Sequence, residues 1–331
     1  MKRLTEDQAK RKAHREQKTR DRAYGAALDG IEKLEKQIEA LKELRGAKSS
    51  YVIKPKATKG AGAEAAAIVC LSDWHVEEVV NPATVMGLNK YNPEIAKARA
   101  THLFQKVLRL VKKEQQDVSI NHLVLWLGGD FISGNIHEEL LENCAMPPVQ
   151  AAMYAQELLY SGLAFLRDHF EGDITVVCNS GNHARMTRQV HISTEYGNSL
   201  ETFIYAALKN RLEDMTWVIP EGYHAVIEVF GKKLAFNHGH YVKYGGGIGT
   251  LTVPLMKAIH GWASAMPDIA HTTIGHFHQY LQHRRFCVNG SLIGYSPYAI
   301  AIKAEYEPPC QAMFLWDKVR GRSISIPILF D

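Results

Sequence analysis

The sequence has few cysteines, and they do not form the pattern of a disulfide framework or of a cysteine-built zinc site. Their number is odd and no Cys-x-x-Cys pair occurs among Cys70, Cys144, Cys178, Cys287 and Cys310. The chain also lacks an apolar run of the roughly 18 residues that a membrane-spanning helix needs. Its polar N-terminus has no apolar core, which argues against a secretory signal. We therefore expect a cytoplasmic protein with no membrane partner.

Positive charge is concentrated at one end of the chain. The net charge is +4, whereas residues 1–22 alone carry nine Lys/Arg against four Asp/Glu, so the other residues sum to −1. A basic segment of this kind is typical of contact with nucleic acid or an acidic partner, and a solubilising arm is the alternative. Hydrophobic residues make up 46% and charged residues 22% of the chain. These values exclude a wholly disordered or fibrous protein.

The sequence divides into three segments. Residues 1–45 predict a basic helical extension with an apolar seam at Tyr24, Ala27, Ile31, Leu34, Ile38 and Leu41. Spacings of three and four residues are the a/d pattern of a coiled coil. The seam favours a homodimer through residues 24–45, and packing against the chain's own folded domain is the alternative. Residues 46–63 predict a flexible linker, and residues 64–331 the folded domain.

Strands and helices alternate through the first half of the folded domain. Apolar runs predict strands at 65–73, 122–130 and 173–183, and helices are expected at 93–117, 148–170 and 197–213. This order implies a parallel sheet with helices on its faces. Beyond residue 220 strand patterns dominate, with a hairpin turning at Gly231–Lys232 and one helix near 251–265. We expect a mixed α/β core built on two sheets.

Side chains that bind metal ions follow the predicted strands. In chain order they are Asp73 and His75, Asp130, Asn182 and His183, His238, and His276 and His278. Sites in open α/β sheets form at the carboxyl ends of the strands, so these side chains are expected to converge. Each short pattern is common by chance. The five patterns occur in order, each after an apolar run, and together they predict that these side chains form one metal-binding site.

The series Asp-x-His, Gly-Asp, Gly-Asn-His, isolated His and Gly-His-x-His resembles the signature of the calcineurin-like metallophosphoesterases. The resemblance covers most of the folded domain and implies a four-layer α/β/β/α sandwich, here preceded by the N-terminal helical extension. It assigns one metal ion to Asp73, His75, Asp130 and His278. It assigns a second ion to Asp130, Asn182, His238 and His276.

The donor set agrees with two divalent metal ions. Carboxylate oxygen and imidazole nitrogen suit Mn²⁺, Fe²⁺, Zn²⁺ or Co²⁺; we expect Mn²⁺, with Mg²⁺ as a further alternative. Asp130 is the candidate to bridge ions about 3.5–4 Å apart. Such ions would supply a hydroxide that attacks phosphorus, and His183 would orient the phosphate or protonate the leaving group. His276 and His278 must diverge toward two ions, and Gly275 would permit the bend.

The loop after Gly-Asn-His departs from the family pattern. Many members carry Asp or Glu there, whereas Ala184 and Arg185 follow His183 in this chain. The carboxylate that would polarise His183 is therefore not supplied locally. We expect Arg185 or Arg188 to hold a substrate phosphate, since guanidinium groups match phosphate oxygens. Plain surface charge is the alternative for each arginine.

A second departure concerns the loop after Asp130. Repair-nuclease relatives carry a histidine a few residues after Gly-Asp, whereas His137 stands seven residues on. We consider His137 a catalytic candidate and Asn135 a substrate-binding candidate, with an ordinary loop histidine as the alternative. His240, two residues beyond His238, is a further substrate-side candidate.

Three functions are compatible with the sequence. The first is a phosphodiesterase or nuclease acting on nucleic acid, with DNA favoured, because of the basic segment, the seam and the arginine-rich loop. For this function the chain resembles phage-encoded, Mn²⁺-dependent and DNA-repair-exonuclease-like members, and a phage protein would act in the host cytoplasm. The second is a small-molecule or phosphoprotein phosphatase, or a cyclic-nucleotide phosphodiesterase, which uses the same ions. The third, a non-catalytic scaffold, is disfavoured by the complete ligand set.

Overall fold

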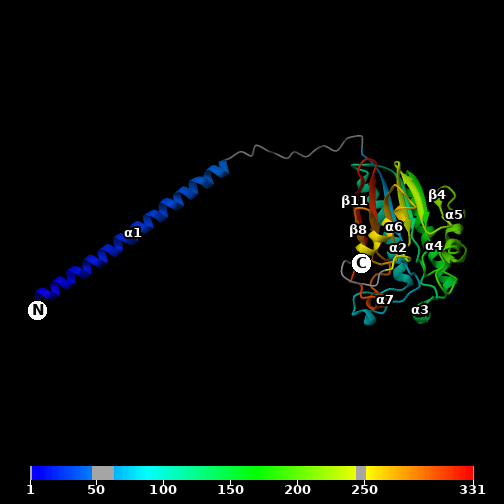
Figure 1. The fold of residues 1–331 in the computed structure, drawn as a ribbon, viewed down its shortest axis with the longest axis horizontal. Helices are drawn as coiled ribbons and strands as arrows, with labels where there is room; N and C mark the ends of the chain where they lie inside the picture. Colours follow the sequence, from blue (N-terminus) through cyan, green and yellow to red (C-terminus); the bar gives the residue numbers. More distant parts are fainter. Residues whose placement is uncertain (1, 47–62, 137, 244–250, 331) are drawn as a thin grey trace. The chain divides into compact units, whose positions relative to one another are not determined.

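The computed structural model describes residues 2–46, 63–136, 138–243 and 251–330. It divides the chain into two compact units, Met1–Ala57 and Thr58–Asp331 (Figure 1). In the first unit, helix α1 (Lys2–Gly46) runs through the whole predicted basic extension. The predicted linker falls almost entirely outside the described residues. Among the helices of the described ranges, none is both long and apolar enough to cross a membrane.

A six-stranded sheet lies in the second unit, with the strand order β11-β10-β1-β2-β3-β4. Its members are β1 (Glu64–Leu71), β2 (Ser119–Leu127), β3 (Asp173–Cys178), β4 (Thr216–Val218), β10 (Cys310–Asp317) and β11 (Gly321–Leu329). Strands β1 to β4 pair in parallel, as the alternating pattern predicted. Strands β10 and β11 extend the sheet antiparallel at the β1 side. The first three strands end before the metal-binding motifs, which therefore lie in loops.

The second sheet has five strands in the order β5-β6-β7-β9-β8. They are β5 (Ala225–Val229), β6 (Lys232–Asn237), β7 (Ile269–Ile274), β8 (Leu281–His283) and β9 (Phe286–Val288). Strands β6, β7 and β9 pair in parallel, and the outer pairs are antiparallel. The β5–β6 hairpin turns at Phe230–Gly231, one residue before the predicted position. Both turn residues have positive φ angles, 50° and 72°, as in the tight turns that match strand twist.

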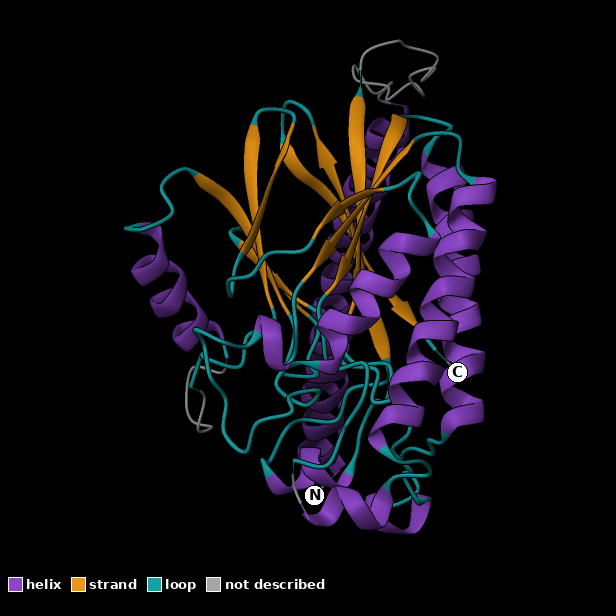
Figure 2. Ribbon diagram, turned by 90° about the vertical axis from the view of Figure 1, so that its right-hand side faces the viewer, coloured by secondary structure: helices purple, strands orange, loops and turns teal. Residues whose placement is uncertain are grey.

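Helices cover the outer faces of both sheets (Figure 2). Helices α2 (Pro93–Glu114), α4 (Pro148–His169) and α5 (Leu200–Arg211) pack on the first sheet, and α6 (Thr252–Ala263) packs on the second. The shorter elements are η1 (Pro82–Val85), α3 (Glu138–Asn143), η2 (Tyr196–Asn198) and α7 (Pro297–Ala301). A separate apolar cluster joins the facing sides of the two sheets. The predicted four-layer α/β/β/α arrangement is confirmed.

Strand β1 shows how one short apolar run serves two cores. Val69 and Leu71 belong to the cluster under the helices, whereas Ile68 and Cys70 belong to the cluster between the sheets. Successive side chains of a strand point to opposite faces, so a strand buried on both sides needs a continuous apolar sequence. The end of β1 is therefore held from both faces, directly before Asp73.

Gly162 of α4 lies against Phe104 of α2, and this contact gives a prediction for stability. A Cβ at position 162 would lie 1.9 Å from ring atom Cε2 of Phe104. We expect Gly162→Ala to lower the free energy of unfolding by about 1–3 kcal/mol through overpacking, despite the better helix propensity of alanine.

Gly261→Ala in α6 is the matched control, because a Cβ there meets nothing within 4 Å. This variant should gain up to about 1 kcal/mol from helix propensity. Urea unfolding of both variants beside the unsubstituted protein measures the difference. Equal stabilities for the two variants would contradict a tight α2–α4 contact.

Candidate metal centre

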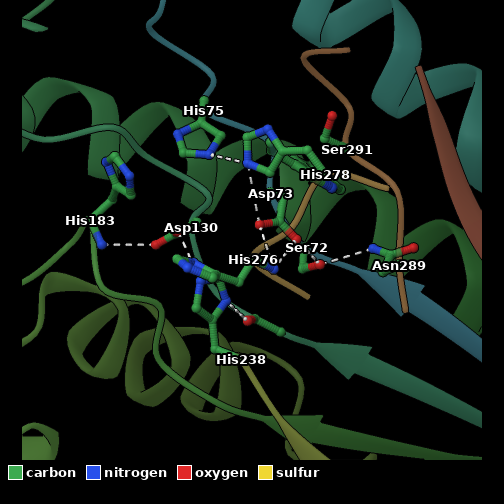
Figure 3. Close-up of polar contacts among 12 residues, drawn as sticks. Ser72, Asp73, His75, Asp130, His183, His238, His276, His278, Asn289 and Ser291 are labelled. Atoms are coloured by element: carbon green, nitrogen blue, oxygen red, sulfur yellow. Dashed lines mark hydrogen bonds and ion pairs between the residues drawn. The ribbon is translucent and has the colours of Figure 1, made fainter. Parts of the chain in front are cut away.

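The structure brings six of the predicted ligands together in two groups. They lie in loops at the carboxyl ends of β1, β2, β6 and β7 (Figure 3). Within each group, one ligand atom from each residue lies within 4.8 Å of the others. The first group is Asp73, His75 and His278, and the second is Asp130, His238 and His276. The resemblance assigns these same residues to two different ions, with Asp130 shared between them.

Two imidazoles and one carboxylate converge in the first group. Nε2 of His75 lies 3.2 Å from Nε2 of His278, which lies 3.5 Å from Oδ1 of Asp73. Asp73 also accepts the backbone N–H of His276 at 2.9 Å, which ties the first group to a residue of the second. The facing ring nitrogens are visible in Figure 3. Burial lowers the pKa of both imidazoles, that of His278 to about 4, so both rings are neutral, the form in which histidine can bind a metal ion.

Asp130 is the centre of the second group. Its Oδ2 lies 2.9 Å from Nε2 of His238, and its Oδ1 accepts the backbone N–H of His183 at 2.8 Å. The rings of His238 and His276 are 5.2 Å apart. Asp130 therefore has one oxygen directed to the loop that carries Asn182 and the other to the second histidine pair.

Outer hydrogen bonds orient the candidate histidine ligands. Nδ1 of His238 donates to the carbonyl oxygen of Gly128 at 2.7 Å, which directs Nε2 to Asp130. Nδ1 of His75 lies 2.9 Å from Oγ of Ser133, and that hydroxyl donates to Glu78 at 2.9 Å. The hydroxyl therefore accepts the Nδ1 proton of His75, and Nε2 retains its electron pair. Partners of this kind fix the tautomer of metal-binding histidines.

Both aspartates are buried, so a nearby positive charge would stabilise their ionised forms. Burial raises the pKa of Asp73 to about 7, and the nearby charge of Asp130 adds to this effect against the opposing influence of His238. Burial also acts to raise the pKa of Asp130, but His238 and His183 outweigh it and hold that pKa well below its usual range. Asp130 in turn raises the pKa of His238 to about 10, against the effect of burial. Only one of the two carboxylates thus has a strong cationic partner.

The backbone is left-handed at five of the seven candidate ligands. Nine non-glycine residues of the described ranges have positive φ, and five of them are Asp73, His75, Asp130, His276 and His278. Such conformations cost on the order of 1–3 kcal/mol each and cluster at functional sites. The bend that separates His276 from His278 therefore lies at the histidines themselves, where φ is 72° and 54°. A Cβ at Gly275 would lie 2.8 Å from Oδ2 of Asp73, so the glycine directly before this bend permits the close approach of Asp73.

Asn182 offers an oxygen that the protein leaves unsatisfied. Its Oδ1 is buried and has no hydrogen-bond partner among the described residues. An orphaned buried acceptor costs about 1–3 kcal/mol, and a bound cation would remove that cost. The imidazoles of His75 and His278 are neutral, and the pKa of Asp73 is raised by burial. Together with the free oxygen of Asn182, these groups fit a divalent metal centre, in which a cation would replace the proton between His238 and Asp130.

His183 is held beside both groups. Its backbone N–H bonds Asp130, its ring lies 4.9 Å from that of His75, and its Nδ1 donates to the carbonyl oxygen of Ser133 at 3.0 Å. The backbone carbonyl of Ser133 thus accepts the Nδ1 proton, a role that the missing carboxylate after Gly-Asn-His would otherwise have.

The remaining candidate residues differ in their exposure to solvent. Arg185 is half-buried and donates to the carbonyl oxygen of Asn182 at 2.5 Å, so it holds its own loop together. Arg188 and Asn135 are exposed. His240 lies 3.4 Å from Glu195, with its ring 5.5 Å from that of His238. His137 lies outside the described residues.

Two buried glutamates support the site and were not predicted. Glu201, at the start of α5, accepts the backbone N–H groups of Phe131 and Gly181 at 2.8 and 2.7 Å. It thereby joins the loop after Asp130 to the loop that carries Asn182. Glu77 accepts the backbone N–H groups of Ser133 and Gly134 at 2.8 and 2.9 Å. Burial raises the pKa of Glu201 to about 8 and that of Glu77 to about 7.

Gly181 provides a test of how closely Asp130 is confined. A Cβ at position 181 would lie 2.0 Å from Oδ1 of Asp130. We expect Gly181→Ala to displace this carboxylate and to weaken Mn²⁺ binding about 10- to 100-fold, the range for lost support of a metal ligand. Isothermal titration calorimetry with Mn²⁺ measures the change.

Gly197→Ala is the control, since a Cβ there meets nothing within 4 Å. It should bind Mn²⁺ as the unsubstituted protein does. Unchanged affinity in Gly181→Ala would show that Asp130 is not held by this contact.

Neither a family model nor a curated protein matches the sequence. Among solved structures, the chain is similar to a dimetal phosphatase from Danio rerio, with 12% identity, a TM-score of 0.36, and 80% of this chain and 99% of the other covered. A Vps29 complexed with zinc from Entamoeba histolytica matches with 13% identity, a TM-score of 0.31, and 80% and 99% coverage. A predicted phosphoesterase from Streptococcus pneumoniae matches with 12% identity, a TM-score of 0.28, and 82% and 100% coverage.

Proposed function

We propose that this chain is a metal-dependent phosphoester hydrolase that holds two divalent cations, with Mn²⁺ as the expected metal. One observation carries the proposal: two groups of three ligand residues, two buried and one half-buried in each, lie after the ends of four strands, with ligand atoms within 4.8 Å of one another in each group. Mixed histidine and carboxylate donors suit Mn²⁺, Fe²⁺, Zn²⁺ or Co²⁺. The motif series that resembles the calcineurin-like metallophosphoesterases supports the same chemistry.

The chain's own residues divide the tasks of the proposed reaction. Asp73, His75 and His278 would hold one ion, and Asp130, Asn182, His238 and His276 the other, with Asp130 as the bridge. Bound cations would supply a hydroxide nucleophile near neutral pH and neutralise charge on the phosphoryl oxygens. His183 donates through Nδ1 to the carbonyl oxygen of Ser133, and we assign its Nε2 to the proton of the leaving oxygen.

For the substrate we propose a phosphodiester of nucleic acid, with DNA favoured. The nine Lys/Arg of residues 1–22 support this choice, because α1 exposes the described side chains of that segment to solvent. Contacts between basic side chains and phosphates release counterions and supply affinity without sequence preference. Arg188, on the loop after His183, is a further exposed cation. A phosphatase or cyclic-nucleotide phosphodiesterase would not need the basic segment.

Replacement of the bridging carboxylate tests the hydrolase. Asp130→Asn keeps an oxygen for the N–H of His183 but removes the negative charge between the groups. Loss of a residue that only supports a metal ligand costs up to about 100-fold. We expect the Mn²⁺-dependent hydrolysis of bis-p-nitrophenyl phosphate by Asp130→Asn to fall by more than this. Asp168→Asn, at an exposed aspartate of α4, is the control and should retain full activity. Equal activity in both variants, or activity that survives EDTA, would contradict a metal site at Asp130.

The same assay over several substrates separates the nuclease from the other hydrolases. Single-stranded DNA, double-stranded DNA, RNA and cyclic nucleotides are compared at two salt concentrations. A nuclease should cleave a polymer, and its affinity should fall with salt by a log–log slope of about 0.9 for each neutralised phosphate of duplex DNA. Turnover of cyclic nucleotides with no cleavage of any polymer would leave the hydrolase in place and reject nucleic acid as the substrate.

His183 gives the last prediction for the reaction. His183→Ala keeps the backbone N–H that bonds Asp130 and removes the imidazole. We expect kcat to fall about 10²- to 10⁴-fold, the contribution of a general acid or base, with Mn²⁺ affinity nearly unchanged in calorimetry. His191→Ala, at an exposed histidine of the same loop, should change neither quantity. Loss of metal from His183→Ala would identify His183 as a ligand instead.

A further inference from the structure

Helix α1 carries an apolar stripe along an otherwise polar surface. Its six large apolar side chains between positions 24 and 41 are 49% to 69% exposed, namely Tyr24, Leu28, Ile31, Leu34, Ile38 and Leu41. A long helix of this composition gains most of its stability from packing an apolar face, not from intrinsic propensity. Gly25 and Gly30 weaken it further, because neither glycine has a close neighbour that requires it.

The kinds of residue in the stripe specify a partner. When Tyr24 is placed at position a of a heptad, Ile31 and Ile38 also fall at a, and Leu34 and Leu41 fall at d. β-branched residues at a with leucine at d favour two parallel strands over other assemblies. We infer that α1 pairs with α1 of a second copy of this chain as a parallel, in-register, two-stranded coiled coil over residues 24–41. At 1.5 Å per residue this coil is about 27 Å long.

Charges beside the seam are compatible with the parallel arrangement. In a parallel dimer, position g of one helix faces position e of the next heptad in its partner. Gln37 then faces Lys42 of the other copy, and Gly30 faces Glu35, so no like charges meet. The ion pair between Glu32 and Lys36 lies at positions b and f, on the outer side of the helix. The seam between the copies is therefore purely apolar.

The basic segment explains why the apolar seam does not extend N-terminal to Tyr24. Continuing the heptads backward places Gln17 and Lys10 at position a and Arg20 at position d. Two copies side by side would bring two segments of net charge +5 together, which opposes pairing beyond Tyr24. This repulsion is screened over about 8 Å at physiological salt. Association through the apolar seam should therefore strengthen as salt rises.

Sedimentation velocity of the full chain tests the dimer, because mass action makes a short coiled coil concentration-dependent between about 1 and about 100 µM. Ile31→Glu/Ile38→Glu places two carboxylates in the seam and should raise the dimer dissociation constant at least about 100-fold, since buried anchors dominate interface energy. Ala26→Glu/Ala40→Glu places two carboxylates at outer positions c of the same helix and should dimerise as the unsubstituted chain does. A monomer at every concentration, a trimer, or equal effects of the two variants would overturn the inference.

Cysteine cross-linking tests the orientation. In the parallel register Ala27, at position d, faces its own counterpart, so Ala27→Cys should form a disulfide-linked dimer under mild oxidation. The unsubstituted chain is the control for its own five cysteines. An antiparallel pair would separate the two positions 27 by about 16 Å along the axis. A dimer in sedimentation that fails to cross-link, or one that weakens as salt rises, would reject the parallel apolar seam.

Discussion

Asp73 and Asp130 are both buried in the candidate metal centre. The rest of the site depends on how the free-energy cost of burying these two carboxylates is offset. A buried carboxylate is tolerated only when it is paired, hydrogen-bonded or neutralised. Asp130 meets this need through His238, whereas Asp73 accepts hydrogen bonds from Ser72 and from the backbone of His276 and still has its pKa raised to about 7. The site therefore has a deficit of positive charge on one side. A divalent cation held by these groups would remove this deficit and could also use the orphaned oxygen of Asn182.

The same side chains require a strained backbone, and the fold supplies the stability that tolerates it. At on the order of 1–3 kcal/mol each, five left-handed ligand residues cost a sizeable part of the stability of an ordinary domain. The strands before them are packed on both faces, by helices on one side and by the opposite sheet on the other. Glu201 and Glu77 then hold the loops through backbone N–H groups. Strain is thus confined to a few residues between a rigid core and buried hydrogen-bond acceptors.

The parts of this arrangement that depend on apolar periodicity and on residue type could be predicted from the sequence. Continuous apolar runs predicted β1, β2 and β3, and polar residues after them predicted where side chains would meet. The left-handed conformation of His276 and His278 could not be predicted, because nothing in Gly-His-Phe-His distinguishes a bend at the glycine from one at the histidines. Glu201 and Glu77 were missed for another reason: glutamate is usually a surface residue, and its burial is decided by backbone groups that are distant in sequence.

The uneven distribution of charge between the two parts of the chain bears on the class of substrate. Residues 1–22 hold a net +5, and all other residues together sum to −1. Attraction of a polyanion by the charge of the chain therefore depends mainly on residues 1–22, and at physiological salt it acts only within about 8 Å. A small phosphoester, held by the cations at the site, would gain little from a separate basic helix. A polymer carries many phosphates, so it could gain from a basic segment as a small phosphoester could not. Pairing of α1 would double the number of basic side chains available to one polymer, so the apolar seam would add to the effect of the basic segment.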